Sequence, residues 1–174
     1  MSDVSIRPAT PADISAITRI YAHAVRHGIA SFELEPPDEA EMMRRQRALL
    51  DDGYPYLVAE IGGALAGYAY AGPYRARPAY RYTVENSIYI APEAHRRGIG
   101  RALLDRLISE CEARNYRLMI AVIGDSGQTP SIELHRAAGF KMVGALEAVG
   151  YKFNRWLDSV LMQRPLGKGS SAPP

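Results

Sequence analysis

Cysteine and long apolar runs are nearly absent from this chain of 174 residues. The single cysteine, Cys111, excludes an internal disulfide, and its place on the apolar stripe of a predicted helix favours a buried structural thiol over a nucleophile. No apolar run is long enough to span a bilayer, so we expect no membrane partner. The early charged residues Asp3, Arg7 and Asp13 argue against a signal peptide, and a reducing, cytoplasmic location is expected.

The chain also has little excess of one charge sign and few histidines. The net charge is +2, which is small for a nucleic-acid-binding domain, because such domains usually carry a strongly basic face. Four histidines and one cysteine show no metal-ligand spacing, so no metal is expected. The rest is an ordinary globular composition in a length that suits one domain. We predict a single domain over residues 1–166 and a flexible tail over 167–174, GKGSSAPP.

The most informative stretch covers residues 87–104, SIYIAPEAHRRGIGRALL. An apolar, β-branched run stops at a proline, crosses a basic loop with two glycines and continues as an amphipathic helix. The free N–H groups and the positive dipole at a helix start bind anions, usually phosphate. Arg96, Arg97 and Arg101 add full positive charges. The stretch therefore predicts a phosphate site, and the alternative is a purely structural turn whose arginines are solvated.

The remaining chain alternates helix and strand patterns. Thr10 caps a predicted helix that ends near His27, and a second helix is predicted from Asp38. Gly62-Gly63 joins two strand patterns into a β-hairpin. Strands are predicted at 4–7, 56–61, 64–71, 81–90, 117–123, 140–149 and 151–163, and two further helices at 98–114 and 130–138. Because this order mixes hairpins with crossovers, we expect an α/β (α+β) fold with a mixed sheet.

The segment His95–Gly100, HRRGIG, resembles the pyrophosphate loop of the GNAT acetyltransferases. Four other blocks resemble the phosphinothricin N-acetyltransferase branch of that superfamily: Ala30–Glu33, Thr83–Ile90, Leu134–Phe140 and Lys152–Asp158. The resemblance runs in matching order over residues 4–166. It implies the GNAT fold, a mixed central sheet of about seven strands flanked by about four helices. It also implies acetyl transfer from acetyl-CoA to the primary amine of a small amino-acid-like acceptor, of the phosphinothricin, methionine sulfone or sulfoximine type.

The resemblance assigns a set of residues to the coenzyme. They are Ile88, Tyr89, Ile90, His95, Arg96, Arg97, Gly98, Ile99, Gly100, Arg101 and Gln128. In this family the strand before the loop diverges from its neighbour, so a main-chain amide near Ile88 or Tyr89 is expected to serve the thioester oxygen. His95 replaces the usual Gln or Arg, a change that a loop working through backbone amides should tolerate. Gln128 replaces an asparagine that contacts the pantetheine arm, and it is one methylene longer.

Two residues are predicted to move protons. Glu85 lies where this branch has its proposed general base. A free glutamate has a pKa near about 4.3, so a water relay or burial is needed for this role. The alternative is a solvated carboxylate paired with Arg81 or Arg77. His135 stands where many members carry a tyrosine that protonates the departing thiolate, and histidine can donate near neutral pH. A histidine that only packs a helix against the sheet is the alternative.

The acceptor site combines aromatic walls with cations. The predicted residues are Phe32, Arg75, Tyr80, Arg81 and Lys152. This lining suits a small zwitterion with a carboxylate and a second anionic or polar group. Alternatively, several of these side chains cover the sheet edge or bind the 3′-phosphate of the coenzyme. The aromatic C-terminal strands resemble regions that pair subunits in this branch, so a homodimer is expected. The alternatives in function are acetylation of an aminoglycoside, polyamine or peptide amine, and a non-catalytic CoA-binding module.

Overall fold

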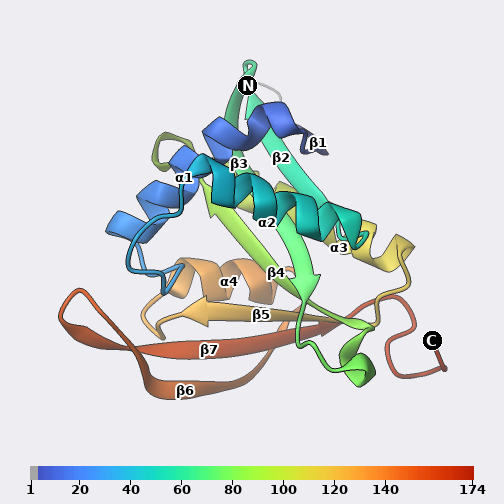
Figure 1. Cartoon of the computed structure of the whole chain (residues 1–174). Helices are drawn as coiled ribbons and strands as arrows, with labels where there is room; N and C mark the ends of the chain where they lie inside the picture. Colours follow the sequence, from blue (N-terminus) through green and yellow to red (C-terminus); the bar gives the residue numbers. More distant parts are fainter. Residues whose placement is uncertain (1–3) are drawn as a thin grey trace.

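A computed structural model describes residues 4–174, which form one seven-stranded sheet with helices on both faces (Figure 1). Asp3, one of the charges that argued against a signal peptide, lies outside these residues. The helices are α1 Ile14–His27, α2 Glu39–Asp51, α3 Ile99–Ala113 and α4 Thr129–Ala137. The strands are β1 Val4–Pro8, β2 Tyr56–Ile61, β3 Ala64–Pro73, β4 Thr83–Ile90, β5 Leu118–Gly124, β6 Lys141–Lys152 and β7 Arg155–Pro165. Three short 3₁₀ turns accompany them, η1 Pro11–Asp13, η2 Pro78–Tyr80 and η3 Pro92–Ala94.

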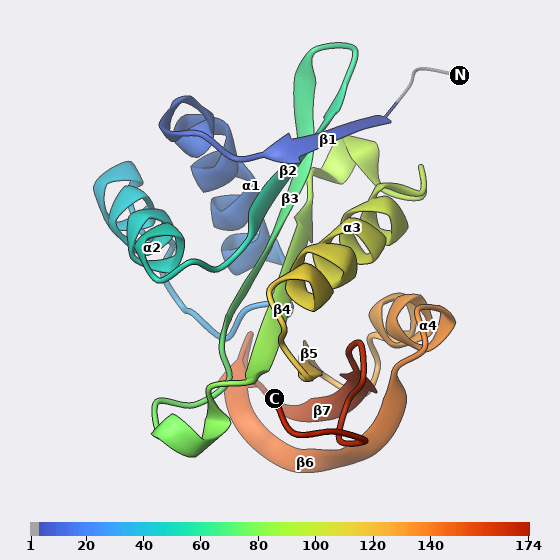
Figure 2. The ribbon, with the colours of Figure 1, turned by 90° about the vertical axis from the view of Figure 1, so that its right-hand side faces the viewer.

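The sheet has the strand order β1-β2-β3-β4-β5-β7-β6. Within residues 4–174, β4 and β5 form its one parallel pair, and every other neighbouring pair is antiparallel. Figure 2 shows α1 and α2 on one face of the sheet and α3 and α4 on the other. The expected mixed sheet flanked by helices is therefore confirmed. The parallel pair is formed because α3 crosses over between β4 and β5.

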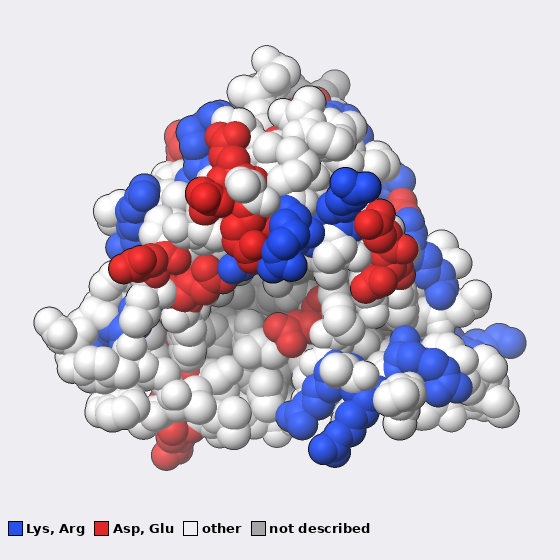
Figure 3. All heavy atoms as spheres, in the orientation of Figure 1, with Lys and Arg blue, Asp and Glu red and all other residues white. Residues whose placement is uncertain are grey.

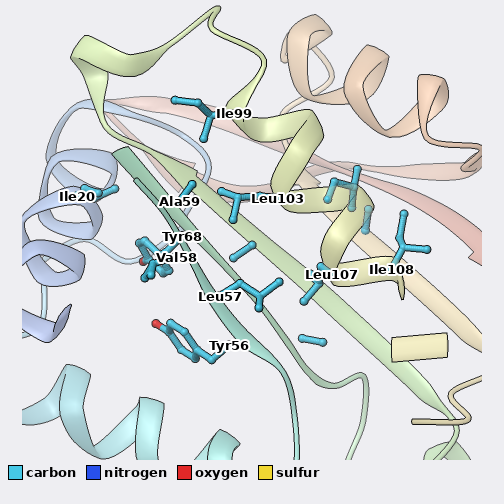
Figure 4. Close-up of a cluster of buried hydrophobic side chains, with 14 of the residues drawn as sticks. Ile20, Tyr56, Leu57, Val58, Ala59, Tyr68, Ile99, Leu103, Leu107 and Ile108 are labelled. Atoms are coloured by element: carbon cyan, nitrogen blue, oxygen red, sulfur yellow. The ribbon is translucent and has the colours of Figure 1, made fainter. Parts of the chain in front are cut away.

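The core between α3 and the sheet holds the start of α3 and the loop before it in place. Leu103 and Leu107 of α3 are fully buried, and Figure 4 shows them directed at the strands that carry Leu57 and Ala59. Burying a leucine side chain contributes about 1.5–3 kcal/mol. Tyr56 and its neighbours on the opposite face pack under α1 and α2 instead, because successive strand residues point to opposite faces. The start of α3 is thus fixed against the middle of the sheet.

The boundary between the last two strands differs from the prediction. The break predicted at Gly150 is wrong, because β6 continues through Gly150 to Lys152. The turn is formed by Phe153 and Asn154, which have φ angles of 54° and 56°. Two consecutive positive φ angles are typical of a two-residue hairpin turn, which asparagine favours and phenylalanine rarely enters. Gly150 stays in the strand, where the missing side chain makes room for the Phe32 ring.

Two other expectations concern single segments. Cys111 is fully buried, and burial raises the pKa of its thiol to about 12, so the structural interpretation is confirmed. Residues 167–174 fold back toward the start of β5, where Arg117 donates to the Pro173 carbonyl at 2.8 Å. The flexibility of this tail stays a prediction. Among residues 4–174, none of the helices combines the length and the apolarity needed to cross a membrane.

Candidate active site

The parallel strands β4 and β5 diverge halfway along β4. Pairing between β4 and β5 runs from Thr83 opposite Leu118 to Asn86 opposite Ala121, and then stops. Beyond this point β4 continues to Ile90 against β3, and β5 continues to Gly124 against β7. We call the space between the two strands after Asn86 the strand gap. The divergence that the family resemblance implied for the strand before the loop is therefore present, and it covers residues 87–90.

The hydrogen bonds at the two ends of β4 show which main-chain groups face the strand gap. The Tyr74 N–H donates to the Thr83 carbonyl at 3.4 Å, and the Ala91 N–H donates to the Ala66 carbonyl at 2.9 Å. Main-chain groups of successive strand residues point to opposite neighbours, so the odd-numbered residues 83–91 bond toward β3. The N–H and C=O groups of Ile88 and Ile90 consequently face the gap. Tyr89, the other residue considered for the oxyanion, turns its main chain toward β3.

The start of α3 follows directly from β4. Gly98 caps the helix with a φ of 78°, a left-handed conformation that glycine adopts without a steric penalty. The first α3 amide that bonds along the helix is that of Ala102, which donates to the Gly98 carbonyl at 3.1 Å. The N–H groups of Ile99, Gly100 and Arg101 therefore point out of the helix end, where the dipole is positive. This arrangement is suited to binding a diphosphate.

The side chains of this loop take different directions. The Arg101 guanidinium contacts Asp105 at 2.7 Å and donates to the Ala137 carbonyl at 3.0 Å. Its side chain thus joins α3 to the end of α4, and its main-chain N–H remains the part that can face a phosphate. The His95 ring lies 3.2 Å from the Ile90 carbonyl through Nε2. Arg96 is exposed and has a φ of 57°. The Arg101 and His95 side chains are thus held by contacts within the protein, and the backbone N–H groups at the start of α3 are the donors directed out of the helix.

The Glu85 side chain lies on the face of β4 that α1 and α2 cover. Its register partner on β3 is Gly72, which has no side chain to fill the space beside the carboxylate. Burial raises the pKa of the Glu85 carboxyl, and no charged neighbour contributes to this shift. Arg81, one of the two partners considered for Glu85, donates to the Pro78 carbonyl and lies over the Tyr82 ring. A half-buried carboxylate with a raised pKa is suited to act as a base.

A cluster of tyrosines beside Glu85 was not predicted as part of the site. Tyr56, Tyr68 and Tyr70 stack on one face of β2 and β3, with ring centroids 5.0–6.3 Å apart. With Tyr21 of α1 they line a cavity of about 30 Å³, large enough for one water molecule. The Tyr68 hydroxyl is buried and has no hydrogen-bond partner in the described part of the chain. The alternating Tyr68 and Tyr70 could have indicated this cluster in the sequence. The same alternation is also typical of tyrosines that only pack in the core, so it did not point to a site.

His135 is buried on α4, on the opposite side of β4 from Glu85. Its Nδ1 lies 2.8 Å from the Ser131 carbonyl, and its Nε2 lies 3.1 Å from Asn86 Oδ1. Burial lowers the pKa of the imidazole, and the Ser131 contact opposes that shift. These contacts support the packing alternative. Gln128 caps the start of the same helix, directly after β5, and thus lies at the far side of the strand gap.

Two of the predicted acceptor residues meet at the loop before α2. Lys152 is buried, and its ammonium donates to the Gly28 carbonyl at 3.0 Å and to the Ser31 carbonyl at 2.7 Å. Lys152 therefore holds the loop rather than presenting an open cation. The loop carries Phe32, whose ring packs over the positions of Gly124 and Gly150, and which remains 38% exposed. The substrate-binding role of Lys152 stays a prediction, and its contacts here are structural.

The other three acceptor candidates lie in the basic loop around η2, which precedes β4. Arg75 packs on the Tyr74 and Tyr80 rings, with its guanidinium 5.2 Å and 5.9 Å from their centroids. The eight residues of β4 span about 26 Å, and they separate this loop from the diphosphate loop. The 3′-phosphate alternative for these arginines does not fit that separation. Figure 3 shows a hollow in this face, with Lys and Arg atoms gathered where η2 lies in Figure 1.

Comparisons with known proteins agree with this geometry. The model of the Acetyltransferase (GNAT) domain family matches residues 6–161. A phosphinothricin N-acetyltransferase of Alcaligenes faecalis is 55% identical over 98% of this chain and 86% of its own length. An L-methionine sulfoximine/L-methionine sulfone acetyltransferase of Salmonella typhimurium is 41% identical over 94% of this chain and 95% of its own.

A solved structure gives the same result in three dimensions. The crystal structure of a GNAT phosphinothricin acetyltransferase from Sinorhizobium meliloti, in complex with acetyl-CoA, is 48% identical and covers 100% of this chain and 94% of its own. The TM-score between the two folds is 0.97. The diverging parallel strands, the glycine-capped helix start and these matches together lead to one conclusion. The chain is a member of the GNAT acetyltransferase family.

Proposed function

We propose that this enzyme transfers the acetyl group of acetyl-CoA to the primary amine of a small amino-acid-like acceptor. The observation that carries the proposal is the strand gap, which presents the Ile88 and Ile90 main chain directly before the glycine-capped start of α3. The relatives named as phosphinothricin and methionine sulfone acetyltransferases support an acceptor of that type. The basic loop with Arg75, Tyr80 and Arg81 suits the anionic groups of such an acceptor.

The residues of the strand gap fit acetyl-CoA. The N–H groups of Ile99, Gly100 and Arg101 would hold the diphosphate at the positive end of α3. The Ile88 N–H would donate to the thioester oxygen, where negative charge develops during the attack of the amine. Gln128, at the N-cap of α4, would contact the pantetheine arm from the other side of the gap. When bound, acetyl-CoA supplies an activated acyl group whose carbonyl carbon the amine attacks directly.

Glu85 takes the proton from the incoming ammonium in this proposal. Glu85 and Ile88 are three positions apart, which is about 10 Å along the strand, so the proton moves through water. The raised pKa of the carboxyl brings it closer to that of the amine, which favours the transfer. His135 remains a candidate donor for the departing thiolate. Its Nε2 must leave Asn86 before it can donate, because both ring nitrogens are engaged.

We further propose a homodimer that forms through β6, in a cytoplasmic enzyme. β6 is the edge of the sheet, and the apolar side chains of the β6–β7 hairpin are exposed, Trp156 by 65% and Tyr151 by 55%. Exposed apolar patches of this kind are typical of interfaces. Sedimentation velocity should give a dimer for the natural chain and a monomer for Trp156→Glu. Leu50→Glu, at an exposed leucine on α2, should stay dimeric, and a monomeric natural chain contradicts the proposal.

The activity is tested by thiol release from acetyl-CoA with a panel of acceptors. Methionine sulfone, methionine sulfoximine and phosphinothricin should release thiol, and a polyamine or an aminoglycoside should release less. Glu85→Gln should keep the calorimetric affinity for acetyl-CoA and lower kcat, most clearly below the pKa of the amine. Failure of the natural chain to bind acetyl-CoA contradicts the whole proposal. Binding without thiol release from any amine indicates a non-catalytic module instead.

A further inference from the structure

The segment between α1 and α2 runs down to the end of β5, where it borders the strand gap (Figure 1). A Cβ added to Gly124 would collide with the Ile29 carbonyl oxygen and would lie 3.0 Å from the Phe32 ring. Gly124 is the last residue of β5, three positions past the last β5 residue that pairs with β4. Counted from that pair, the matching β4 position comes directly after Ile88, whose N–H faces the gap. We call residues 28–33 the Phe32 loop.

The Phe32 loop lies on the face of the sheet that carries the Glu85 side chain. Ile120 of β5 is the register partner of Glu85, and register partners on neighbouring strands direct their side chains to the same face. Gly124 is four residues beyond Ile120, so its Cβ position points to this face as well. In the proposed function the acceptor amine meets Glu85 from this face, and the Phe32 ring, which is 38% exposed, lies beside its path.

Glu33, the residue after Phe32, ties the loop to both helices on this face. Its carboxylate accepts from the Tyr21 hydroxyl of α1 at 3.0 Å and from Nη1 of Arg45 of α2 at 2.6 Å. The Glu33 N–H donates to the Ser31 hydroxyl oxygen at 3.2 Å, and that oxygen lies 2.9 Å from the Tyr21 hydroxyl. The residues on both sides of the ring are thus bound to α1, and Glu33 adds a bond to α2.

The Arg45–Glu33 ion pair joins the loop to a side chain that is itself fixed. Arg45 Nε donates to Glu41, one helix turn earlier, at 2.7 Å, while Nη1 reaches Glu33. Hydrogen bonds between two charged groups are shorter and about twice as strong as neutral ones. Lys152 binds carbonyls that precede the ring, and the ion pair holds the residue that follows it.

We propose that Glu33 is a positioning residue for the acceptor, because its bonds to Arg45 and Tyr21 fix the Phe32 ring beside the strand gap. The inference rests on the proposed function and deepens it. Glu33 acts through Phe32 and touches none of the reacting atoms. A loosened loop has to be ordered when the acceptor binds, so its loss of freedom weakens acceptor binding. Coenzyme binding at the start of α3 does not depend on this loop.

The test compares Arg45→Met with Arg44→Met, using the acceptor that releases thiol fastest in the panel above. Both arginines bind Glu41 at 2.7 Å, and of the two only Arg45 also reaches Glu33. At saturating acetyl-CoA, Arg45→Met should raise the acceptor KM about three- to tenfold, the effect of ordering one loosened side chain on binding. Arg44→Met should leave the acceptor KM unchanged. Both variants should keep the natural Kd for acetyl-CoA in a calorimetric titration.

Variants of Glu33 separate positioning from a general loss of packing. Glu33→Ala should raise the acceptor KM at least as much as Arg45→Met does. The double variant should raise it no further than Glu33→Ala alone, because both substitutions break the same ion pair. Glu33→Gln keeps an oxygen that accepts from Tyr21 and Arg45, so its KM should lie between those of the natural chain and Glu33→Ala.

An acceptor KM in Arg45→Met equal to that of Arg44→Met overturns the inference. An equal rise in the Kd for acetyl-CoA also overturns it, since the effect would then not be confined to the acceptor. Should Arg45→Met fail to fold, Glu33→Gln takes its place, because it removes the charge at almost unchanged size, and a natural KM in that variant overturns the inference. If the natural chain releases no thiol with any amine, the proposed function fails, whereas an active natural chain with variants of natural KM defeats this inference alone.

Discussion

Gly98→Ala tests the proposed diphosphate-binding role of the loop before α3 separately from the contribution of this loop to folding. Gly98 has a φ of 78°, and no atom lies within 4 Å of the Cβ that alanine would add. The cost of the substitution is therefore conformational rather than steric within the protein. A left-handed conformation costs a residue with a Cβ about 1–2 kcal/mol relative to glycine. The structure offers a matched position in Gly63, which has a φ of 80° and equally open surroundings in the β2–β3 turn.

The two variants should differ in their Kd for acetyl-CoA and should carry the same conformational cost in the backbone. In Gly98→Ala, either the exposed loop relaxes or the new methyl group stands where the diphosphate approaches. Both effects weaken acetyl-CoA binding, and about 1–2 kcal/mol corresponds to a rise of roughly 5- to 30-fold in its Kd. In Gly63→Ala, the same cost lowers the free energy of unfolding and leaves the Kd for acetyl-CoA at its natural value.

Calorimetric titration with acetyl-CoA and urea unfolding measure the two quantities. The acceptor KM, determined at saturating acetyl-CoA, should be unchanged in both variants, because neither glycine lies near the acceptor loops. A natural Kd in Gly98→Ala, together with a lowered free energy of unfolding, would refute the assignment of this loop to the diphosphate. An equal rise of Kd in Gly63→Ala would show that the effect is not local.

Three further outcomes are expected from other parts of the molecule. Hydrogen bonds from Arg7 lower the pKa of Asp13 from its ordinary 3.8 to about 2, so the ionised carboxylate stabilises the fold above pH 4 and this contribution is lost as the pH falls toward 2. Asp13→Asn should therefore lower the free energy of urea unfolding by about 1–2 kcal/mol at pH 7 and by less at pH 2.5, and a constant difference contradicts the reasoning. Lys152→Met leaves two loop carbonyls without their donor and should lower the free energy of unfolding by about 2 kcal/mol, while raising the acceptor KM. Gly150→Ala places a methyl group against the Phe32 ring and should raise the acceptor KM several-fold at an unchanged Kd for acetyl-CoA, and the reverse pattern would place Phe32 outside the acceptor site.

The sequence by itself determined the order of the elements and the glycine-capped helix start for which a phosphate site is predicted. Local signals carry both: Asp38 accepts the Glu41 N–H at the start of α2 as a capping residue does, and Gly62-Gly63 forms the hairpin turn with two positive φ angles. HRRGIG combines a helix start with the glycine that its cap requires, so a phosphate site could be predicted from neighbouring residues alone. The turn at Phe153 was missed because phenylalanine is a weak signal for a positive φ.

Only the tertiary structure decided which groups face the site. Ile88 rather than Tyr89 turns its main chain into the strand gap because of the hydrogen-bond register with β3, and register depends on a strand distant in sequence. The contacts of the Lys152 ammonium depend on folding, which brings it to carbonyls more than a hundred positions away. His135 and Asn86 meet across 49 residues. Such pairings follow from long-range packing, which composition and periodicity do not encode.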